Sequence, residues 1–353
     1  MPRLMIMAGG TGGHIYPGLA VASVARQRGW DVVWLGNPEG MEARLVPEQG
    51  YEMAWVSFGG LRGKGLVRKL MLPVNLLRAF WQALRALRRT RPDVVIGMGG
   101  YISFPGGMMA ALMGKPLLVH EQNSVAGLAN RVLASVADKV LSGFPEVIRS
   151  ARWIGNPVRH EIESLPAPEQ RFAGREGPLR ILVVGGSLGA QTLNDTVPRA
   201  LAMLPTNQRP HVVHQSGAKQ IDALRAAYAA AGVEGELLPF IDDMAAQYAR
   251  ADLVICRAGA LTVAELAAAG AASLLVPYPH AVDDHQTGNA RFLTERGAGE
   301  LIAQKDLTPE LLAARLATLD RGKLLQMAQS ARKCARRQVA VAVADACEAA
   351  LKS

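Results

Sequence analysis

The chain has 353 residues, of which 50% are hydrophobic and 20% are charged, so it can bury a large core and is long enough for two domains. Its three cysteines, Cys256, Cys334 and Cys347, are far apart and match no CxxC or Cys/His ligand spacing, which argues against a disulfide scaffold and fits a reducing cytosol. The formal net charge is +9, so an anionic partner is expected.

The first apolar run, Leu4 to Ala8, passes at once into glycines, so no apolar segment of signal-peptide length is present there. The longest uncharged stretch, 94–114, holds several glycines and a proline and is a poor membrane helix. It fits a strand, a loop and a helix. We therefore expect neither export nor a transmembrane span.

Apolar runs rich in Val, Ile and Leu alternate with Ala-rich helical stretches, a pattern typical of βα units around a parallel sheet. Leu4 to Ala8 leads into the glycine loop 9–14, and Ile181 to Val184 leads into the glycine loop 185–190. The two loops start 176 residues apart, about half the chain, which predicts two doubly wound α/β domains in tandem. The proline-containing stretch 164–178 is the expected boundary region.

A glycine-rich turn between a strand and a helix exposes backbone N–H groups at the positive end of the helix dipole and can bind phosphate. Neither loop reads GxGxxG, and neither second strand, Asp31 to Gly36 or His211 to Gln215, ends in the acid that would hold a dinucleotide ribose. A tight turn that merely needs glycine at positive φ is the alternative. His14, at the entrance to the first helix, is either a helix cap or a functional group.

Residues 53–92 contain nine Lys or Arg side chains and no acid. Within this window an apolar stripe recurs at helical spacing: Leu70, Val74, Leu77, Phe80, Trp81, Leu84 and Leu87. A core-facing helix would have the same stripe. The absence of acids and the two aromatic residues favour a helix that lies on anionic lipid, with Arg68 and Lys69 beside it.

The buried-strand pattern Asp252 to Cys256 leads into residues 257–265, where Thr262 and Glu265 have the spacing of a capping box. A helix N-terminus beside Arg257 is also a good seat for a diphosphate. The aspartate pairs at 242–243 and 283–284 match no closed metal site, so we read them as caps and turns and expect no metal.

Six motifs in the same order, spread over nearly the whole chain, closely resemble the MurG transferase family. They are Gly-Gly-Thr-Gly-Gly-His (9–14), Gly-Leu-Arg-Gly-Lys-Gly (60–65), His-Glu-Gln-Asn (120–123), Gly-Asn-Pro-Val-Arg (155–159), Phe-Ile-Asp-Asp-Met (240–244) and Arg-Ala-Gly-Ala-Leu-Thr-Val-Ala-Glu (257–265). The resemblance implies a GT-B fold of two Rossmann-like domains facing across a cleft. It assigns 1–158 and 337–353 to an acceptor- and membrane-facing domain, with the last helix crossing back, and 159–336 to a UDP-N-acetylglucosamine domain.

The same resemblance implies the donor-binding residues. In the second domain the backbone of Ile241 recognises uracil, Arg159 lies near the nucleotide, and Glu265 accepts from the ribose hydroxyls. Gln286 and Asn289 read the sugar. The remaining donor contacts are Thr11, Gly12, Gly13 and Asn123 from the first domain, and Ser187, Ala260, Leu261, Thr262, Val263 and Ala264 at the diphosphate. The family usually has Ser at the position of Ala264, a difference that matters only if that hydroxyl touches phosphate.

The implied reaction inverts the α-linked donor into a β-1,4 linkage on the muramyl 4-hydroxyl of lipid I, giving lipid II for peptidoglycan. His14 is the expected general base, since histidine exchanges protons near neutral pH, and Glu121 is the fallback. Helix N-termini and Arg257 are expected to stabilise the leaving diphosphate without a metal or cofactor.

The resemblance places the enzyme peripherally on the cytoplasmic face of the inner membrane, with anionic phospholipid and proteins of cell-wall synthesis and division as partners. A diacylglycerol glycosyltransferase is the nearest alternative, and a UDP-sugar epimerase fits the basic apolar helix less well. A non-catalytic binding protein would explain the basic charge but not the paired glycine loops. The chain lacks an aromatic-basic nucleic-acid motif, so no nucleic-acid partner is expected.

Overall fold

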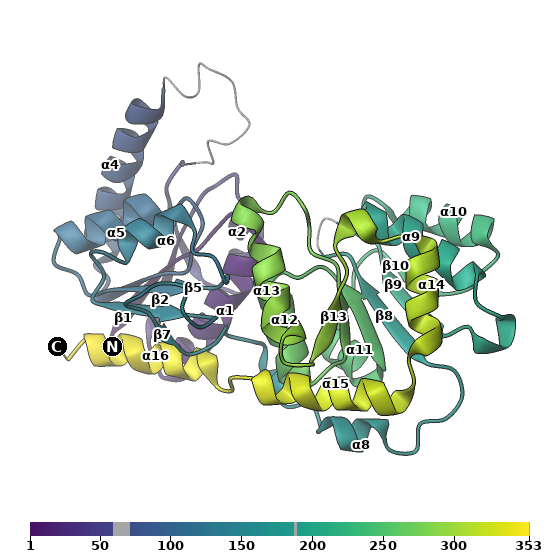
Figure 1. Ribbon diagram of the computed structural model, residues 1–353. Helices are drawn as coiled ribbons and strands as arrows, with labels where there is room; N and C mark the ends of the chain where they lie inside the picture. The colour runs from purple at the N-terminus through teal and green to yellow at the C-terminus, as the bar shows by residue number, and fades with distance from the viewer. Residues whose placement is uncertain (59–70, 187–188, 353) are drawn as a thin grey trace. The chain divides into compact units, whose positions relative to one another are not determined.

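The computed structural model describes residues 1–58, 71–186 and 189–352, which divide into two compact units. Unit 1 comprises Met1–Pro157 and Gln338–Ser353, and unit 2 comprises Val158–Arg337. Each unit is an α/β layer structure with a central parallel sheet (Figure 1). No described helix has the length and apolar character needed to cross a membrane.

The sheet of unit 1 has the strand order β3-β2-β1-β4-β5-β6-β7, and all of its strand pairs are parallel. Its strands are β1 (Arg3–Met7), β2 (Asp31–Gly36), β3 (Glu52–Trp55), β4 (Val94–Gly97), β5 (Leu117–Glu121), β6 (Lys139–Ser142) and β7 (Arg152–Trp153). Its helices are α1 (Gly12–Gln27), α2 (Glu42–Glu48), α4 (Leu72–Thr90), α5 (Ser103–Leu112), α6 (Leu128–Leu133) and α16 (Val339–Ala350).

Strands β4 and β5 of unit 1 are buried throughout and β1 nearly so, which explains their nearly continuous apolar sequence, whereas the edge strands β3 and β7 are largely exposed or half-buried. Successive side chains of β1 alternate between two cores: Leu4 and Ile6 pack with α1 and α16, whereas Met5 and Met7 pack with α4 and α5. Arg28, at the end of α1, forms ion pairs with Asp345 (2.6 Å) and Glu348 (3.4 Å) of α16. The expected return of the last helix to the first domain is therefore confirmed.

Unit 2 repeats this topology with the order β10-β9-β8-β11-β12-β13. Its strands are β8 (Arg180–Val184), β9 (His211–Gln215), β10 (Glu236–Leu238), β11 (Leu253–Cys256), β12 (Ser273–Leu275) and β13 (Gly299–Leu301). Its α-helices are α7 (His160–Glu163), α8 (Pro168–Phe172), α9 (Gln191–Ala202), α10 (Ile221–Ala231), α11 (Met244–Arg250), α12 (Ala260–Ala269), α13 (His285–Thr294), α14 (Pro309–Thr318) and α15 (Arg321–Cys334). The predicted tandem of doubly wound domains is confirmed.

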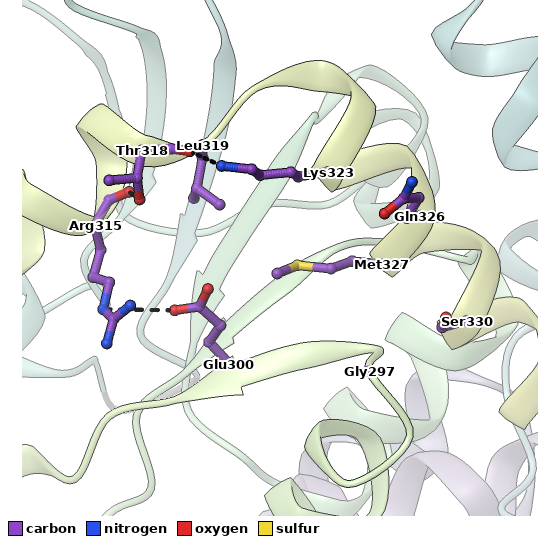
Figure 2. Close-up of a pocket in the computed structure, with 9 residues that line it drawn as sticks. All are labelled: Gly297, Glu300, Arg315, Thr318, Leu319, Lys323, Gln326, Met327 and Ser330. Carbon is purple, nitrogen blue, oxygen red and sulfur yellow. Dashed lines mark hydrogen bonds and ion pairs between the residues drawn. The ribbon is translucent and has the colours of Figure 1, made fainter.

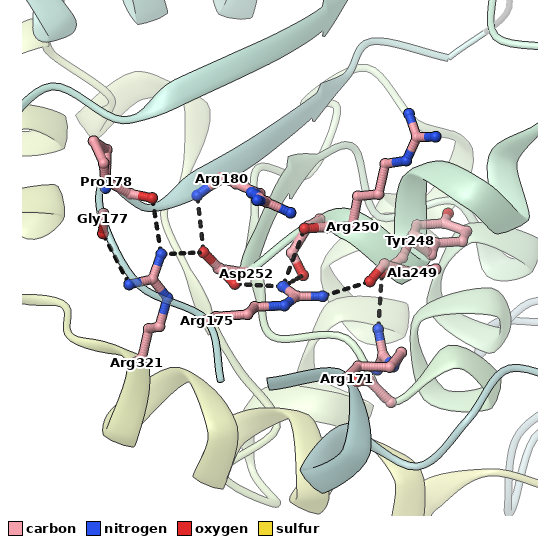
Figure 3. Close-up of polar contacts among 12 residues, drawn as sticks. Arg171, Arg175, Gly177, Pro178, Arg180, Tyr248, Ala249, Arg250, Asp252 and Arg321 are labelled. Carbon is pink, nitrogen blue, oxygen red and sulfur yellow. Dashed lines mark hydrogen bonds and ion pairs between the residues drawn. The ribbon is translucent and has the colours of Figure 1, made fainter. Parts of the chain in front are cut away.

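The boundary expected at 164–178 is wrong, because this stretch lies inside unit 2 and is fastened to it by arginines. Arg175 donates to the buried Asp252 at 2.5 Å and to the Ala249 carbonyl, and Arg321 joins the same carboxylate at 3.3 Å (Figure 3). Arg171 donates to the carbonyl of Tyr248. Proline marks the start of α8 here and not a linker.

Candidate active site

In both sheets the order in which the chain adds strands reverses at the same place. This switch lies between β1 and β4 in unit 1 and between β8 and β11 in unit 2. In open parallel sheets ligands bind beyond the carboxyl ends of the strands at such switch points. The glycine loops 9–13 and 185–190 follow β1 and β8, and residues 257–260 follow β11. These three loops therefore lie where ligand-binding loops are expected, whereas the motif at 60–65 lies outside the described residues.

The first glycine loop is held by a buried carboxylate. Glu42, 1% exposed, accepts hydrogen bonds from the backbone N–H of Gly10 and of Asn37, both at 3.0 Å. An anion at Gly10 would meet this carboxylate, so the amide of Gly10 is no phosphate ligand here. Thr11, Gly12 and Gly13, at the start of α1, remain predicted donor contacts.

His14 lies in the first turn of α1 and caps nothing with its side chain. Its Nδ1 is 3.0 Å from Oε1 of Gln122, which directly follows β5. Gly99, with φ +99°, lies against the ring: a Cβ there would come within 2.6 Å of Nδ1, so only glycine fits this approach. Within the described residues, Nε2 has no hydrogen-bond partner, and the imidazole is partly exposed.

Glu121, the fallback base, is 2% exposed and organises its own loop. Its oxygens accept from the backbone N–H of Asn123 (2.9 Å) and Gly127 (3.1 Å) and from Nδ2 of Asn130 (2.8 Å). With Nδ2 of Asn123 at 3.4 Å, four donors already occupy this carboxylate, which favours a structural role for Glu121 and leaves His14 as the better candidate base.

The second glycine loop is braced from β9. Oε1 of Gln215 accepts from the N–H of Gly186 at 3.2 Å, and Nε2 donates to the Gly186 carbonyl at 3.1 Å. Gly189 has φ +78°, and a Cβ there would lie 2.0 Å from the Ser216 carbonyl oxygen. The predicted diphosphate ligand Ser187 lies outside the described residues.

Thr262 and Glu265 do not form the capping box that is the alternative interpretation of their spacing. Helix α12 begins at Ala260 with Gly259 as its N-cap, so Thr262 lies inside the first turn and Glu265 in the second. No side chain caps this helix end, and its first turn contains no acid. The N–H groups of Ala260, Leu261 and Thr262 therefore offer a positive dipole end to an anion.

Glu265 is 7% exposed and is held by two partners from distant parts of unit 2. Oε1 accepts from Nη2 of Arg159 at 3.1 Å, and Oε2 accepts from the Tyr248 hydroxyl at 3.2 Å. Burial raises the pKa of Glu265, while the Arg159 charge and hydrogen bond act in the opposite direction. The structure therefore brings two predicted nucleotide ligands together and adds Tyr248, which the sequence reading missed.

Other residues predicted to bind the sugar nucleotide form hydrogen bonds or pack inside unit 2. Asn289 is fully buried and donates from Nδ2 to the Ala258 carbonyl at 3.1 Å, just ahead of α12. Oε1 of Gln286 accepts from the Tyr278 N–H at 2.9 Å. Ile241 is buried between β10 and α11, Val263 is buried within α12, and Leu261 and Ala264 are partly buried there. These contacts shape the loops around α12.

Arg257 directly follows β11 and is half-buried. It donates from Nη1 to the Val276 carbonyl at 3.1 Å and from Nη2 to Oε1 of Gln304 at 2.6 Å. Burial lowers its pKa, and the Tyr278 side chain opposes that shift. These contacts tie β11 to the segments that follow β12 and β13, so Arg257 acts here as a brace.

The aspartate pairs behave as turn residues. Asp243 caps α11 by accepting from the Ala246 N–H at 2.9 Å, and Asp284 accepts from the Thr287 hydroxyl at 2.7 Å. In residues 1–58, 71–186 and 189–352, no three His, Cys, Asp or Glu side chains gather as metal ligands. That the reaction needs no metal stays a prediction.

A hollow of about 480 Å³ in unit 2 is not the candidate site. Figure 2 shows it between α14, α15 and β13, where Arg315 points toward Glu300 and Lys323 bonds the Thr318 carbonyl. None of the predicted site residues lines it.

Comparison with known proteins decides the family. Residues 4–142 match the N-terminal domain model of glycosyltransferase family 28, and residues 180–345 match its C-terminal domain model. An Azoarcus sp. (strain BH72) protein is 71% identical over 99% of this chain and 98% of its own length; it is named UDP-N-acetylglucosamine-N-acetylmuramyl-(pentapeptide) pyrophosphoryl-undecaprenol N-acetylglucosamine transferase. The chain belongs to the MurG family of glycosyltransferases.

A solved structure agrees with this MurG assignment. The crystal structure of Acinetobacter baumannii MurG is 43% identical, with a TM-score of 0.86 over 99% of this chain and 100% of that one. The kitacinnamycin glycosyltransferase, at 17% identity and a TM-score of 0.70, shares the fold. The predicted GT-B class with two Rossmann-like domains is thereby confirmed.

Proposed function

We propose that this chain transfers N-acetylglucosamine from UDP to the 4-hydroxyl of the muramyl sugar of lipid I, giving lipid II. The observation that carries this proposal is the 71% identity, over 99% of the chain, to a transferase named for this donor and acceptor. Eight relatives at 60 to 71% identity carry the same name, so a diacylglycerol acceptor is not favoured.

The site residues support a single inverting displacement. Nε2 of His14 takes the proton of the acceptor 4-hydroxyl, the hydroxyl oxygen attacks C1 of the donor sugar, and the bond from C1 to the UDP oxygen breaks. UDP leaves with the electron pair. The uncapped first turn of α12 presents N–H groups that can stabilise the charge developing on the diphosphate.

The donor lies on unit 2 in this proposal. Glu265 accepts from the ribose hydroxyls, because each carboxylate oxygen has a second lone pair beside the one used by Arg159 or Tyr248. The backbone of Ile241 meets uracil, and Gln286 and Asn289 lie near the sugar. Unit 1 contributes the base and receives the acceptor.

The acceptor decides between the two lipid glycosyltransferase functions. We expect the purified full-length chain to move label from UDP-N-acetylglucosamine to a muramyl-pentapeptide diphospholipid and to leave diacylglycerol in mixed micelles unlabelled. UDP-glucose in place of the donor should give little product. Efficient labelling of diacylglycerol would overturn the proposed function.

The membrane contact is proposed to be α4, although the predicted stripe is divided between two faces. Leu87 is buried in the core, and Phe80 packs on Phe104 with ring centroids 5.7 Å apart. The outer face instead exposes Val74 (55%), Leu77 (69%) and Trp81 (56%). Arg68, Lys69 and Leu70 lie outside the described residues.

Basic side chains surround this outer face. Arg85 lies over the Trp81 ring at 4.6 Å, and Arg78, Arg88 and Arg89 are exposed on the same helix. Apolar residues that enter the lipid interface beside arginines that meet anionic headgroups make a peripheral membrane anchor. We propose that it holds the enzyme on the anionic cytoplasmic leaflet, where its polyprenyl-linked acceptor resides.

Vesicle binding tests the anchor. We expect co-sedimentation to require anionic lipid and to weaken in high salt, and Leu77→Ser with Trp81→Ser to weaken it by about tenfold or more, since each buried large apolar side chain contributes roughly 1.5–3 kcal/mol. Met203→Ser, which alters an apolar side chain of unit 2 that is 52% exposed, is the matched control. Binding that is indifferent to lipid charge and to both serines would reject the anchor.

A further inference from the structure

A row of hydrogen bonds runs from the buried backbone at Gly155 to the partly exposed His14. Nε2 of His120 is 2.9 Å from the Gly155 carbonyl oxygen, and Nδ1 of His120 is 3.0 Å from Nε2 of Gln122. The other amide atom of Gln122, Oε1, is 3.0 Å from Nδ1 of His14. His120 is 0% exposed and Gln122 is 1% exposed, so water does not compete for the contacts among Gly155, His120 and Gln122, whereas His14 is partly exposed.

The directions of the bonds in this row are fixed by two backbone carbonyls, those of Gly155 and His120, which can only accept. The Gly155 carbonyl can only accept, so Nε2 of His120 carries the hydrogen. Burial lowers the pKa of His120, and it therefore stays neutral with a lone pair on Nδ1. That lone pair needs a donor, which must be the NH₂ group of Gln122; the same NH₂ also donates to the His120 carbonyl at 3.0 Å.

The amide of Gln122 consequently turns its oxygen toward His14. An amide oxygen only accepts, so Nδ1 of His14 must carry a hydrogen, and in the neutral ring the lone pair then lies on Nε2. We propose that Gln122 and His120 are positioning residues that hold His14 as its Nδ1–H tautomer, with Nε2 ready to take the proton of the acceptor hydroxyl. This inference rests on the proposed function of His14.

The surrounding backbone holds the His14 ring within hydrogen-bond distance of Gln122. Gly99 leaves room for the imidazole on one side, and the first turn of α1 anchors its Cα. Nδ2 of Asn156 donates to the Gln122 carbonyl at 2.9 Å, which fixes the backbone that carries the amide. The arrangement resembles other catalytic bases in which a third group selects the tautomer and the orientation.

Two substitutions of nearly equal size separate positioning from packing. Gln122→Met removes the acceptor at His14, whereas Gln122→Glu keeps an oxygen there but buries a charge. We expect Gln122→Met to lower kcat roughly tenfold or more, with KM for UDP-N-acetylglucosamine changed less than about twofold, and Gln122→Glu to retain more kcat at mildly alkaline pH. If Gln122 served only packing, the buried charge would make Gln122→Glu the worse variant.

Nitrogen NMR of ¹⁵N-histidine-labelled full-length protein, without substrate, reads the tautomer directly. The seven histidines allow the His14 signals to be assigned by their loss in His14→Ala. We expect a protonated Nδ1 and an unprotonated Nε2 in the native chain, and a shift toward Nε2–H in Gln122→Met. An unchanged His14 tautomer in Gln122→Met would overturn the inference, even if Gln122→Glu failed to fold.

The double variant separates this inference from the proposed function. Because the row acts through His14, adding Gln122→Met to His14→Ala should change the residual rate little. A large further loss would show that Gln122 acts by another route and would reject positioning. Failure of the native chain to glycosylate the muramyl lipid would instead reject the proposed function, and the NMR readout would stand unaffected.

Discussion

His14→Ala should lower kcat by about 10²–10⁴-fold while the Kd of UDP-N-acetylglucosamine changes less than about threefold. The reason is that the imidazole, braced on Gln122 with Nε2 unpartnered among the described residues, is placed to take the hydroxyl proton. Most of the donor contacts proposed above lie on unit 2, so removing this side chain leaves donor binding largely intact. Single-turnover rates and calorimetric titration of the donor measure the two quantities separately.

A chemically matched control is His211→Ala, which removes an exposed histidine at the start of β9. Its kcat should equal that of the native chain, and the melting temperatures of both variants should show that each is folded. Near-normal turnover in His14→Ala would make the base assignment wrong. A parallel collapse of donor affinity would mean that His14 binds the donor and does not act as a base.

Much of the fold could be predicted because its signals are local. The strands Asp31 to Gly36 and His211 to Gln215 have the bounds read from the sequence, and β1 differs by one residue at each end. A buried parallel strand is a short apolar run that ends in turn residues, and both properties belong to adjacent residues. The half-chain spacing of the glycine loops then implied the repeated topology.

The errors arose where distant residues decide the outcome. Composition marked 164–178 as a boundary, yet Asp252 and two arginines fasten it inside unit 2. In α4, the apolar periodicity predicted how the side chains are arranged around the helix axis but not which face of the helix packs on the core. The small residues Ala79, Ala83 and Ala86 let the helix approach the sheet, so Val74, Leu77 and Trp81 stay outside.

The sequence predicted which motifs form the candidate site but not which side chains contact one another within it. The spacing of Thr262 and Glu265 suggested a local cap, but Glu265 pairs with Arg159, which is 106 residues away. Tyr248 gave no signal in the sequence, because a tyrosine in a short helix is ordinary. The order of bonds from Gly155 through Gln122 to His14 depends on three separate loops and could only be read from the structure.

Glu265→Gln should weaken donor binding by roughly 10- to 100-fold, the range expected for hydrogen bonds to a charged acceptor, with a smaller effect on kcat. The neutral amide offers one acceptor where the carboxylate offers two, and its NH₂ must face either Arg159 or the Tyr248 hydroxyl. Tyr248→Phe is the matched control, because it removes one hydrogen bond and keeps the charge. Its loss of affinity should be clearly smaller.

Donor binding should also depend on pH, and the pKa of Glu265 determines the direction of that dependence. Burial raises the pKa of Glu265, and the groups facing it are Arg159, Tyr248 and Cys256. The ionised form is the one that accepts two ribose hydroxyls, so donor affinity should fall as the pH drops through this raised pKa, at a higher pH than an ordinary glutamate would give. For stability the sign is opposite: a raised carboxyl pKa favours the folded state at low pH, and that contribution is lost as the pH rises through it. Calorimetric titrations of the donor across mildly acidic pH should show a donor affinity that falls with decreasing pH in the native chain but not in Glu265→Gln. The same pH dependence in both chains would mean that Glu265 does not hold the ribose.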